Sequence, residues 1–186
     1  MIYKHKKDSQ VKLTELMLPS HSNFSGKIHG GYILNLMDQI AFACASKHSG
    51  NYCVTASVNR VDFLNSIDVG ELINLKASVN YTGHTSMVIG VRVEAENIKT
   101  GNIKHCNSSF FTMVAKDDDG KNVAVPGLIL DSLDSARRYL RSIRQQEHAR
   151  SRDERFRSEN FNLEDYLEDL KNRNAQLTEA LFSVDS

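Results

Sequence analysis

The chain has 186 residues, enough for one domain of ordinary size with a sizeable core, or for one domain plus an appendage. Its 23 basic and 23 acidic residues cancel, so no overall field attracts nucleic acid or an acidic membrane. The start is polar, and the longest apolar stretch, residues 32–45, is too short to span a bilayer. We therefore expect a cytoplasmic protein with no nucleic-acid partner and no membrane span.

The cysteines and histidines do not indicate a cofactor. Cys44, Cys53 and Cys106 are an odd number without CxxC spacing, which favours buried, reduced thiols. The seven histidines are scattered without metal-ligand spacing. We expect no metal and no cofactor.

Composition changes abruptly near residue 130. All ten glycines and both prolines precede it, and nine of the eleven arginines follow it. A stretch without breakers and rich in Arg, Glu and Leu is typical of helix. We predict one domain at residues 1–130 and a charged helical C-terminal extension at residues 131–186. Leucines at near-heptad spacing in the extension favour helix pairing, and a solvated appendage is the alternative.

The first 130 residues predict a strand, a helix and then a run of strands. Residues 12–18 form a plausible edge strand that Pro19 ends. Gly30 and Gly31 open a helix that stops at Gly50. Alternating segments then predict strands at residues 53–63, 72–81, 86–95 and 105–115. This is an α+β layout with the sheet folded around the helix.

The predicted helix is apolar almost all round, so it should be buried. Asn35, Asp38 and Gln39 nevertheless share one of its faces, at spacings i, i+3 and i+4. An isolated carboxylate in such a place is costly unless it is paired or hydrated. That face must therefore meet water, a partner chain or a ligand. A structural carboxylate, capping or paired in an interface, is the alternative.

The segment from Asn23 to Asp38, NFSGKIHGGYILNLMD, resembles the signature of the cytosolic acyl-CoA hydrolases, hotdog thioesterases of the YciA and brain acyl-CoA hydrolase type. The resemblance continues in ordered blocks, VTASVNRVDF from residue 54, YTGHTSM from residue 81 and EAENIKTG from residue 94. It covers roughly residues 10–127. The ordered set of blocks is far more specific than a lone His-Gly-Gly.

The resemblance implies a hotdog fold, a long central helix wrapped by a five- or six-stranded antiparallel sheet. It implies hydrolysis of fatty-acyl-CoA to free fatty acid and CoA by a homodimer with sites at the subunit interface, often assembled as a trimer of dimers, a hexamer. In the family the acidic residue that matches Asp38 is catalytic, and the asparagine that matches Asn23 is functional. Asn23 would face Asp38 of the partner subunit.

Thioester hydrolysis needs a base or nucleophile near the carbonyl carbon and donors for the developing oxyanion. Gly30 and Gly31 let a carbonyl approach the free N–H groups at the helix start, and we expect the Gly31 N–H to donate to the thioester oxygen. Asp38 would act as general base for water, with direct nucleophilic attack as the alternative. His29 precedes the helix, and we expect it to shape the oxyanion loop rather than transfer a proton.

The remaining candidates surround the substrate. Thr55 and Ser57, two apart on one strand, share a face and could both support the base through hydrogen bonds, and Ser57 would also lie with the CoA-binding residues. Ordinary strand hydroxyls are the alternative for both. CoA phosphates attract cations, and Arg60 is the first candidate, a surface strand charge being the alternative. In the family a donor-rich turn lines the CoA channel, and its residues here are Thr82, Gly83, Thr85 and Ser86.

Two other functions compete with hydrolysis. A non-catalytic acyl-CoA-binding sensor could couple to a partner through the helical extension, but no DNA-binding segment accompanies it. A hotdog hydratase usually places Asp and His together, whereas Asp38 has Gln39 beside it and no His nearby in sequence. Hydrolysis is the leading hypothesis.

Overall fold

The structure is a computed structural model that describes all residues except 1, 60, 156, 158–160, 172 and 174–186. The chain divides into two compact units, Met1–Ile143 and Arg144–Ser186. The predicted domain boundary after residue 130 stays a prediction. The first helix of the predicted extension, α3 (Leu133–Arg155), begins within the first unit.

The central helix, α2, spans Gly30–Ser49, as predicted. It ends where Gly50 adopts φ 75° and donates its N–H to the Ser46 carbonyl at 2.8 Å, a left-handed cap that glycine adopts without strain. Ile33, Met37 and Ile40 are among its side chains that are at most 3% exposed. Burial of each such side chain contributes about 1.5–3 kcal/mol to folding.

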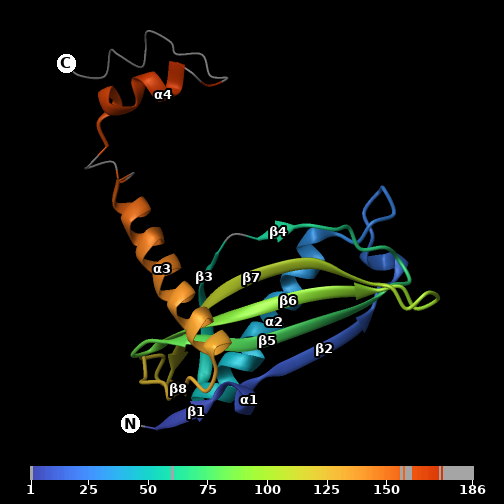
Figure 1. Cartoon of the computed structure of the whole chain (residues 1–186), viewed down its shortest axis with the longest axis horizontal. Helices are drawn as coiled ribbons and strands as arrows, with labels where there is room; N and C mark the ends of the chain where they lie inside the picture. The colour runs from blue at the N-terminus through green and yellow to red at the C-terminus, as the bar shows by residue number, and fades with distance from the viewer. Residues whose placement is uncertain (1, 60, 156, 158–160, 172, 174–186) are drawn as a thin grey trace. The chain divides into compact units, whose positions relative to one another are not determined.

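A six-stranded antiparallel sheet curls around α2 (Figure 1). Its strand order is β2-β5-β6-β7-β3, and β4 also pairs with β7. The strands are β2 (Val11–Leu16), β3 (Tyr52–Val58), β4 (Asp62–Phe63), β5 (Leu72–Thr82), β6 (Ser86–Glu96) and β7 (Ile103–Lys116). The inward side chains of β5, β6 and β7 alternate with outward ones and form one core with α2. The predicted hotdog arrangement is confirmed.

One predicted strand is two. The alternating stretch at residues 53–63 forms β3 and β4, both antiparallel to β7. The register against β7 shifts between Thr55 and Ser57, which bends the strand as a β-bulge does. Alternation alone does not reveal such a break, because the bulge adds one residue without changing the composition.

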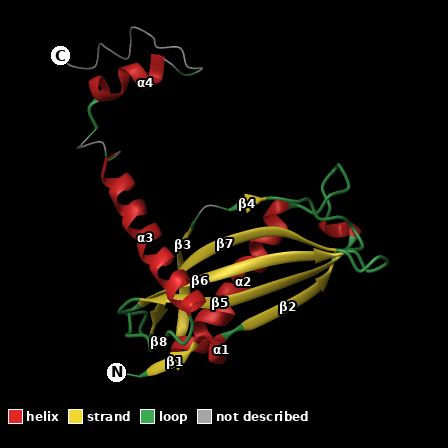
Figure 2. Cartoon of the chain, viewed as in Figure 1, coloured by secondary structure: helices red, strands yellow, loops and turns green. Residues whose placement is uncertain are grey.

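Smaller elements join the ends of the first unit. β1 (Tyr3–His5) pairs in parallel with β8 (Gly127–Ile129), and the short helix α1 (Lys6–Ser9) follows β1 (Figure 2). A 3₁₀ turn at Pro19–His21 follows β2, which ends at Leu16. The described part of the second unit holds the end of α3, a 3₁₀ turn at Leu163–Tyr166 and α4 (Leu167–Lys171), so the predicted extension is helical there.

Among the described residues, no helix is both long and apolar enough to cross a membrane.

A buried histidine connects α2 to these smaller elements. His48 is 0% exposed; its Nε2 lies 3.1 Å from the Pro126 carbonyl and its Nδ1 lies 3.2 Å from the Ser9 hydroxyl. A neutral ring that donates from Nε2 and accepts at Nδ1 satisfies both contacts. Burial lowers the pKa of His48, although the Pro126 carbonyl opposes that shift.

We expect the unfolding free energy to fall as the pH drops below about 6.5. In that range His48 gains a proton in the unfolded chain, whereas its lowered pKa keeps it neutral in the folded chain. One proton contributes a slope of at most about 1.4 kcal/mol per pH unit. Urea unfolding of wild type and His48→Gln between pH 7.5 and 5.5 checks this. The substitution should remove part of the slope, whereas His148→Gln, at an exposed position, should not. Equal slopes in all three proteins would contradict the assignment.

Candidate active site

Asp38 lies in a cleft between α2 and β3. The cleft has a volume of about 510 Å³. Its lining residues are Asp38, Gln39 and Phe42 of α2 and Tyr52, Cys53, Val54 and Thr55 of β3. The Thr55 hydroxyl donates to Asp38 Oδ1 at 2.6 Å, and it also lies 3.3 Å from the Met113 sulfur. The carboxylate is the stronger acceptor, so Thr55 fixes one Asp38 oxygen and leaves the other free to act on a ligand.

The polar face of α2 is open in the single chain, as its composition required. Asn35 and Gln39 are exposed and Asp38 is half-buried. β3, beside this face, is the last strand of the sheet and pairs only with β7 among the described strands. Tyr52 and Val58 on β3 are 63% and 42% exposed. An unpaired strand edge that carries exposed apolar side chains is a surface suited to a second chain.

The start of α2 offers backbone donors. Neither the Gly30 nor the Gly31 N–H has an acceptor among the described residues, as expected of a first helical turn. A Cβ at Gly31 would meet nothing within 4 Å, so open space adjoins that amide. A Cβ at Gly30 would lie 3.1 Å from the Phe63 ring, which covers the helix start. His29 is the exposed residue before the helix, and its side chain makes no capping hydrogen bond.

Asn23 organises the loop that precedes α2. Its side-chain oxygen accepts from the Ser25 N–H at 3.0 Å, the Ser25 hydroxyl at 2.7 Å and the Lys27 N–H at 3.2 Å. Gly26, at φ 75°, closes the turn. No hydrogen bond joins Asn23 to Asp38 in the described chain.

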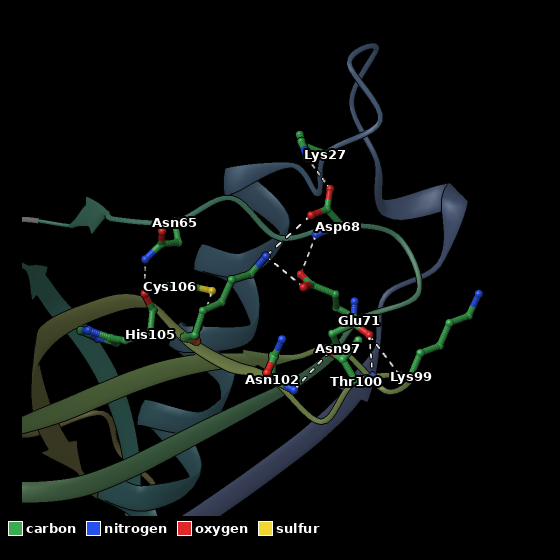
Figure 3. A network of polar contacts seen from close by, with 11 residues as sticks. Lys27, Asn65, Asp68, Glu71, Asn97, Lys99, Thr100, Asn102, His105 and Cys106 are labelled. Atoms are coloured by element: carbon green, nitrogen blue, oxygen red, sulfur yellow. Dashed lines mark hydrogen bonds and ion pairs between the residues drawn. The ribbon is translucent and has the colours of Figure 1, made fainter.

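Ion pairs anchor this loop to the sheet (Figure 3). Lys27 pairs with Asp68, and Lys104 of β7 lies 3.6 Å from Asp68 and 2.9 Å from Glu71. The Lys27 hydrogen bond holds the pKa of Asp68 below its usual value, with a further contribution from Lys104. Glu71 is only 7% exposed, and its carboxylate also accepts from the Asp68 N–H at 2.8 Å. The network fixes the loop that carries Asn23 against the rigid sheet.

The donor-rich turn between β5 and β6 lies elsewhere. The Gly83 N–H donates to the Ser86 carbonyl at 2.7 Å, and the Thr85 carbonyl accepts from Ala115. Thr82 and Gly83 line a second cavity of about 480 Å³ together with Ser49, at the C-terminal end of α2. The turn and the Asn23 loop therefore lie near opposite ends of a 20-residue helix, about 30 Å long.

The predicted site residues thus fall into separate groups within one chain. The structure brings Asp38 and Thr55 together, and it places Gly30 and Gly31 at the helix start. Ser57 is exposed on β3 beyond the bulge. Arg60 lies outside the described residues. No three His, Cys, Asp or Glu side chains in the described part of the chain gather as metal ligands.

One polar residue near the helix start was missed. Asn107 of β7 is 0% exposed, and neither its side-chain oxygen nor its nitrogen has a partner among the described residues. It lies opposite Phe63 of β4, whose ring covers Gly30. The signal was available, because Asn107 is in phase with the inward residues Phe111 and Met113 of the same strand.

We expect Asn107→Leu to raise the unfolding free energy by about 1–3 kcal/mol, because it removes a buried polar group that has no partner. Asn80→Leu is the matched control, because buried Asn80 accepts a hydrogen bond from the Ser78 hydroxyl at 3.3 Å. Its replacement should lower the unfolding free energy. Urea unfolding of both variants checks the opposite signs. Destabilisation by both would show that Asn107 is satisfied in the folded chain.

Comparisons with known proteins place the chain among enzymes of one kind. The sequence profile of the Thioesterase superfamily matches residues 25–102. Protein VdlD of Helicobacter pylori (strain ATCC 700392 / 26695) is 37% identical over 75% of this chain and 79% of the relative. The uncharacterized acyl-CoA thioester hydrolase YkhA of Bacillus subtilis (strain 168) is 35% identical over 66% of this chain and 72% of the relative.

Solved structures agree. An apo-hexameric acyl-CoA thioesterase superposes with a TM-score of 0.80 at 36% identity, over 82% of this chain and 98% of that one. An acyl-CoA hydrolase from Staphylococcus aureus, solved with butyryl coenzyme A, coenzyme A and coenzyme A disulfide, has a TM-score of 0.76 at 29% identity, over 81% and 92%. That hydrolase has also been solved with one asparagine, one aspartate and one threonine each replaced by alanine.

Proposed function

This chain belongs to the thioesterase superfamily, and on that premise we propose that it hydrolyses fatty-acyl-CoA to free fatty acid and CoA. The observation that carries the proposal is the 2.6 Å hydrogen bond from Thr55 to Asp38, in an open cleft beside the polar face of a mostly apolar helix. It leaves a carboxylate oriented by one neighbour and accessible to a ligand.

The spacing of three residues supports these assignments. In the S. aureus hydrolase, the replaced aspartate lies 15 positions after the replaced asparagine, and the replaced threonine lies 17 positions after that aspartate. Asn23, Asp38 and Thr55 stand at the same intervals of 15 and 17 residues here. The three residues chosen for replacement in the relative therefore have counterparts of the same type in this chain.

In the proposed reaction, Asp38 takes a proton from water as the water oxygen attacks the thioester carbon. The N–H of Gly31 stabilises the oxyanion, a donor worth about 3 kcal/mol of barrier. Collapse breaks the C–S bond, and the proton held by Asp38 passes to the CoA thiolate. Direct attack by Asp38, giving an anhydride that water then cleaves, is the alternative. Single turnover in ¹⁸O water detects the anhydride route when water attacks the Asp38 carbonyl, because the label then enters the enzyme, whereas the base mechanism labels only the fatty acid.

The geometry of α2 favours a site to which two chains contribute residues. Gly31 and Asp38 are seven residues apart on α2, about 10 Å along its axis. One thioester carbonyl cannot contact both at hydrogen-bonding distance. A dimer that covers the open β3 edge would bring Asn23 and Gly31 of one chain to Asp38 of the other. We propose such a homodimer, assembled as a trimer of dimers, as the hexameric relative suggests.

The buried side chain of Asn107 is a candidate for contact with the substrate. Its buried amide is on the residue paired with Phe63, and the Phe63 ring lies against Gly30 at the helix start. A ligand carbonyl or amide that enters at the helix start would give it the partner that the described chain lacks. We assign Asn107 to substrate contact at this end of the site.

We expect Asp38→Asn to lower kcat by about 10²–10⁴-fold, the contribution of a general base, with little change in folding. Release of CoA thiol from acyl-CoAs of graded chain length measures this and also gives the preferred acyl length. Asp119→Asn, at an exposed position with no proposed role, is the charge-matched control. Wild-type turnover in a folded Asp38→Asn protein would contradict the assignment. Binding of acyl-CoA without any turnover by the wild type would favour the sensor.

Subunit complementation tests the shared site. Asn23→Ala and Asp38→Asn, each expected to be nearly inactive alone, are co-expressed with different tags. A mixed dimer would hold one site with both native residues, so random pairing should restore about a quarter of wild-type activity. Mixed oligomers no more active than either parent would show that Asn23 and Asp38 serve the same site within one chain.

A further inference from the structure

A row of cations crosses the outer face of the sheet, the face turned away from α2. Lys12 of β2 lies directly opposite Lys76 of β5, and Lys76 lies directly opposite Arg92 of β6. All three side chains are on the outer face, since Leu75 and Ala77, which flank Lys76, belong to the core. Like charges on directly opposed residues destabilise a sheet. Sheet formation by itself therefore does not account for the row.

Two helices bring further cations to the same place. Lys6 of α1 and Arg138 of α3 join the row in lining a cleft of about 220 Å³, the cationic cleft. The small residues Ser78 and Gly90 also line it and leave it room. Tyr139 holds this part of α3 on the sheet, because its hydroxyl donates to a carbonyl of β5 at 3.3 Å. None of the lining residues, all within the described chain, is acidic.

Nearby carboxylates balance only part of this charge. Glu94 accepts from both Lys76, at 2.6 Å, and Arg92, at 2.7 Å, so two cations share one carboxylate. Asp134 pairs with Arg138 at 2.7 Å and with one further arginine outside the cleft. Asp131 is a third nearby carboxylate, whose charge acts on Lys6. Five lining cations therefore face three carboxylates.

Lys6 and Lys12 have no ion pair among the residues that the structure describes. Burial lowers the pKa of Lys6 below its usual value, and the charge of Arg138 lowers it further. The charges of Asp134 and Asp131 oppose this shift only in part, and a bound anion would favour the charged form further. The cleft thus combines unpaired cations with space for a ligand.

We propose that the cationic cleft binds the diphosphate group of a diphosphate ester. Phosphate oxygens accept charge-assisted hydrogen bonds from lysine and bidentate ones from arginine. The row spans three strands set about 4.8 Å apart, so two linked phosphates match it better than one. A bound diphosphate offsets the repulsion within the row and links α1 and α3 to the sheet. This site is separate from the thioester cleft and does not depend on the proposed hydrolysis.

The test measures binding of inorganic pyrophosphate to the full chain by titration calorimetry at low, constant ionic strength. We compare wild type with Lys6→Gln/Lys12→Gln, which removes the two unpaired cations, and with Lys99→Gln/Lys121→Gln, which removes two exposed lysines away from the cleft. Both pairs change the net charge equally. The cleft pair should weaken binding by at least about tenfold, the effect of losing one good charge-assisted contact, and the control pair by less than about twofold.

Absence of binding to wild type, or equal weakening by both pairs, would overturn the proposal, since the charge would then act only through the overall field. Competition identifies the source of the ester. Displacement of pyrophosphate by ADP assigns the cleft to nucleoside diphosphates, and displacement by CoA but not ADP assigns it to CoA. Displacement by neither would overturn the assignment to a diphosphate ester.

Discussion

The structure depends on covering a helix that is apolar nearly all round. α2 has buried side chains toward β5, β6 and β7, and burial of each large one contributes about 1.5–3 kcal/mol to folding. A flat sheet would cover one side of such a helix, whereas a curled sheet covers most of its circumference. The remaining strip carries Asn35, Asp38 and Gln39, which tolerate water. The only acidic residue of α2 therefore lies where the sheet leaves the helix open.

The end of the sheet and the open strip of α2 lie side by side. β3 is the last strand, its bulge lies at Thr55 and Ser57, and Thr55 reaches Asp38 across the cleft. The strand edge, with exposed Tyr52, resembles an interface more than a solvated surface. The same geometry that leaves Asp38 accessible thus favours a second chain, which would complete the site and cover the edge together.

Local signals predicted the central elements well. The glycines Gly30-Gly31 and Gly50 mark the two ends of α2, and alternation predicted the long strands. Both signals depend only on residues close together in the sequence. The break between β3 and β4 and the parallel pairing of β1 with β8 were not predicted, since each depends on residues far away in the chain. The cationic cleft could not be predicted from the sequence either. Lys12, Lys76 and Arg92 become neighbours only through the register of their strands.

The sequence by itself determined that a buried helix carries a carboxylate that needs water, a ligand or a partner, and its ordered blocks indicated the family. Only the tertiary structure decided which hydroxyl orients Asp38, and that Asn107 is buried without a partner in the described chain. It also decided that the edge of β3 lies beside the open face of α2, with no further strand paired to it in the described chain. The physical reason is that composition and periodicity report burial along the chain, whereas a site depends on distances between segments that only packing brings together.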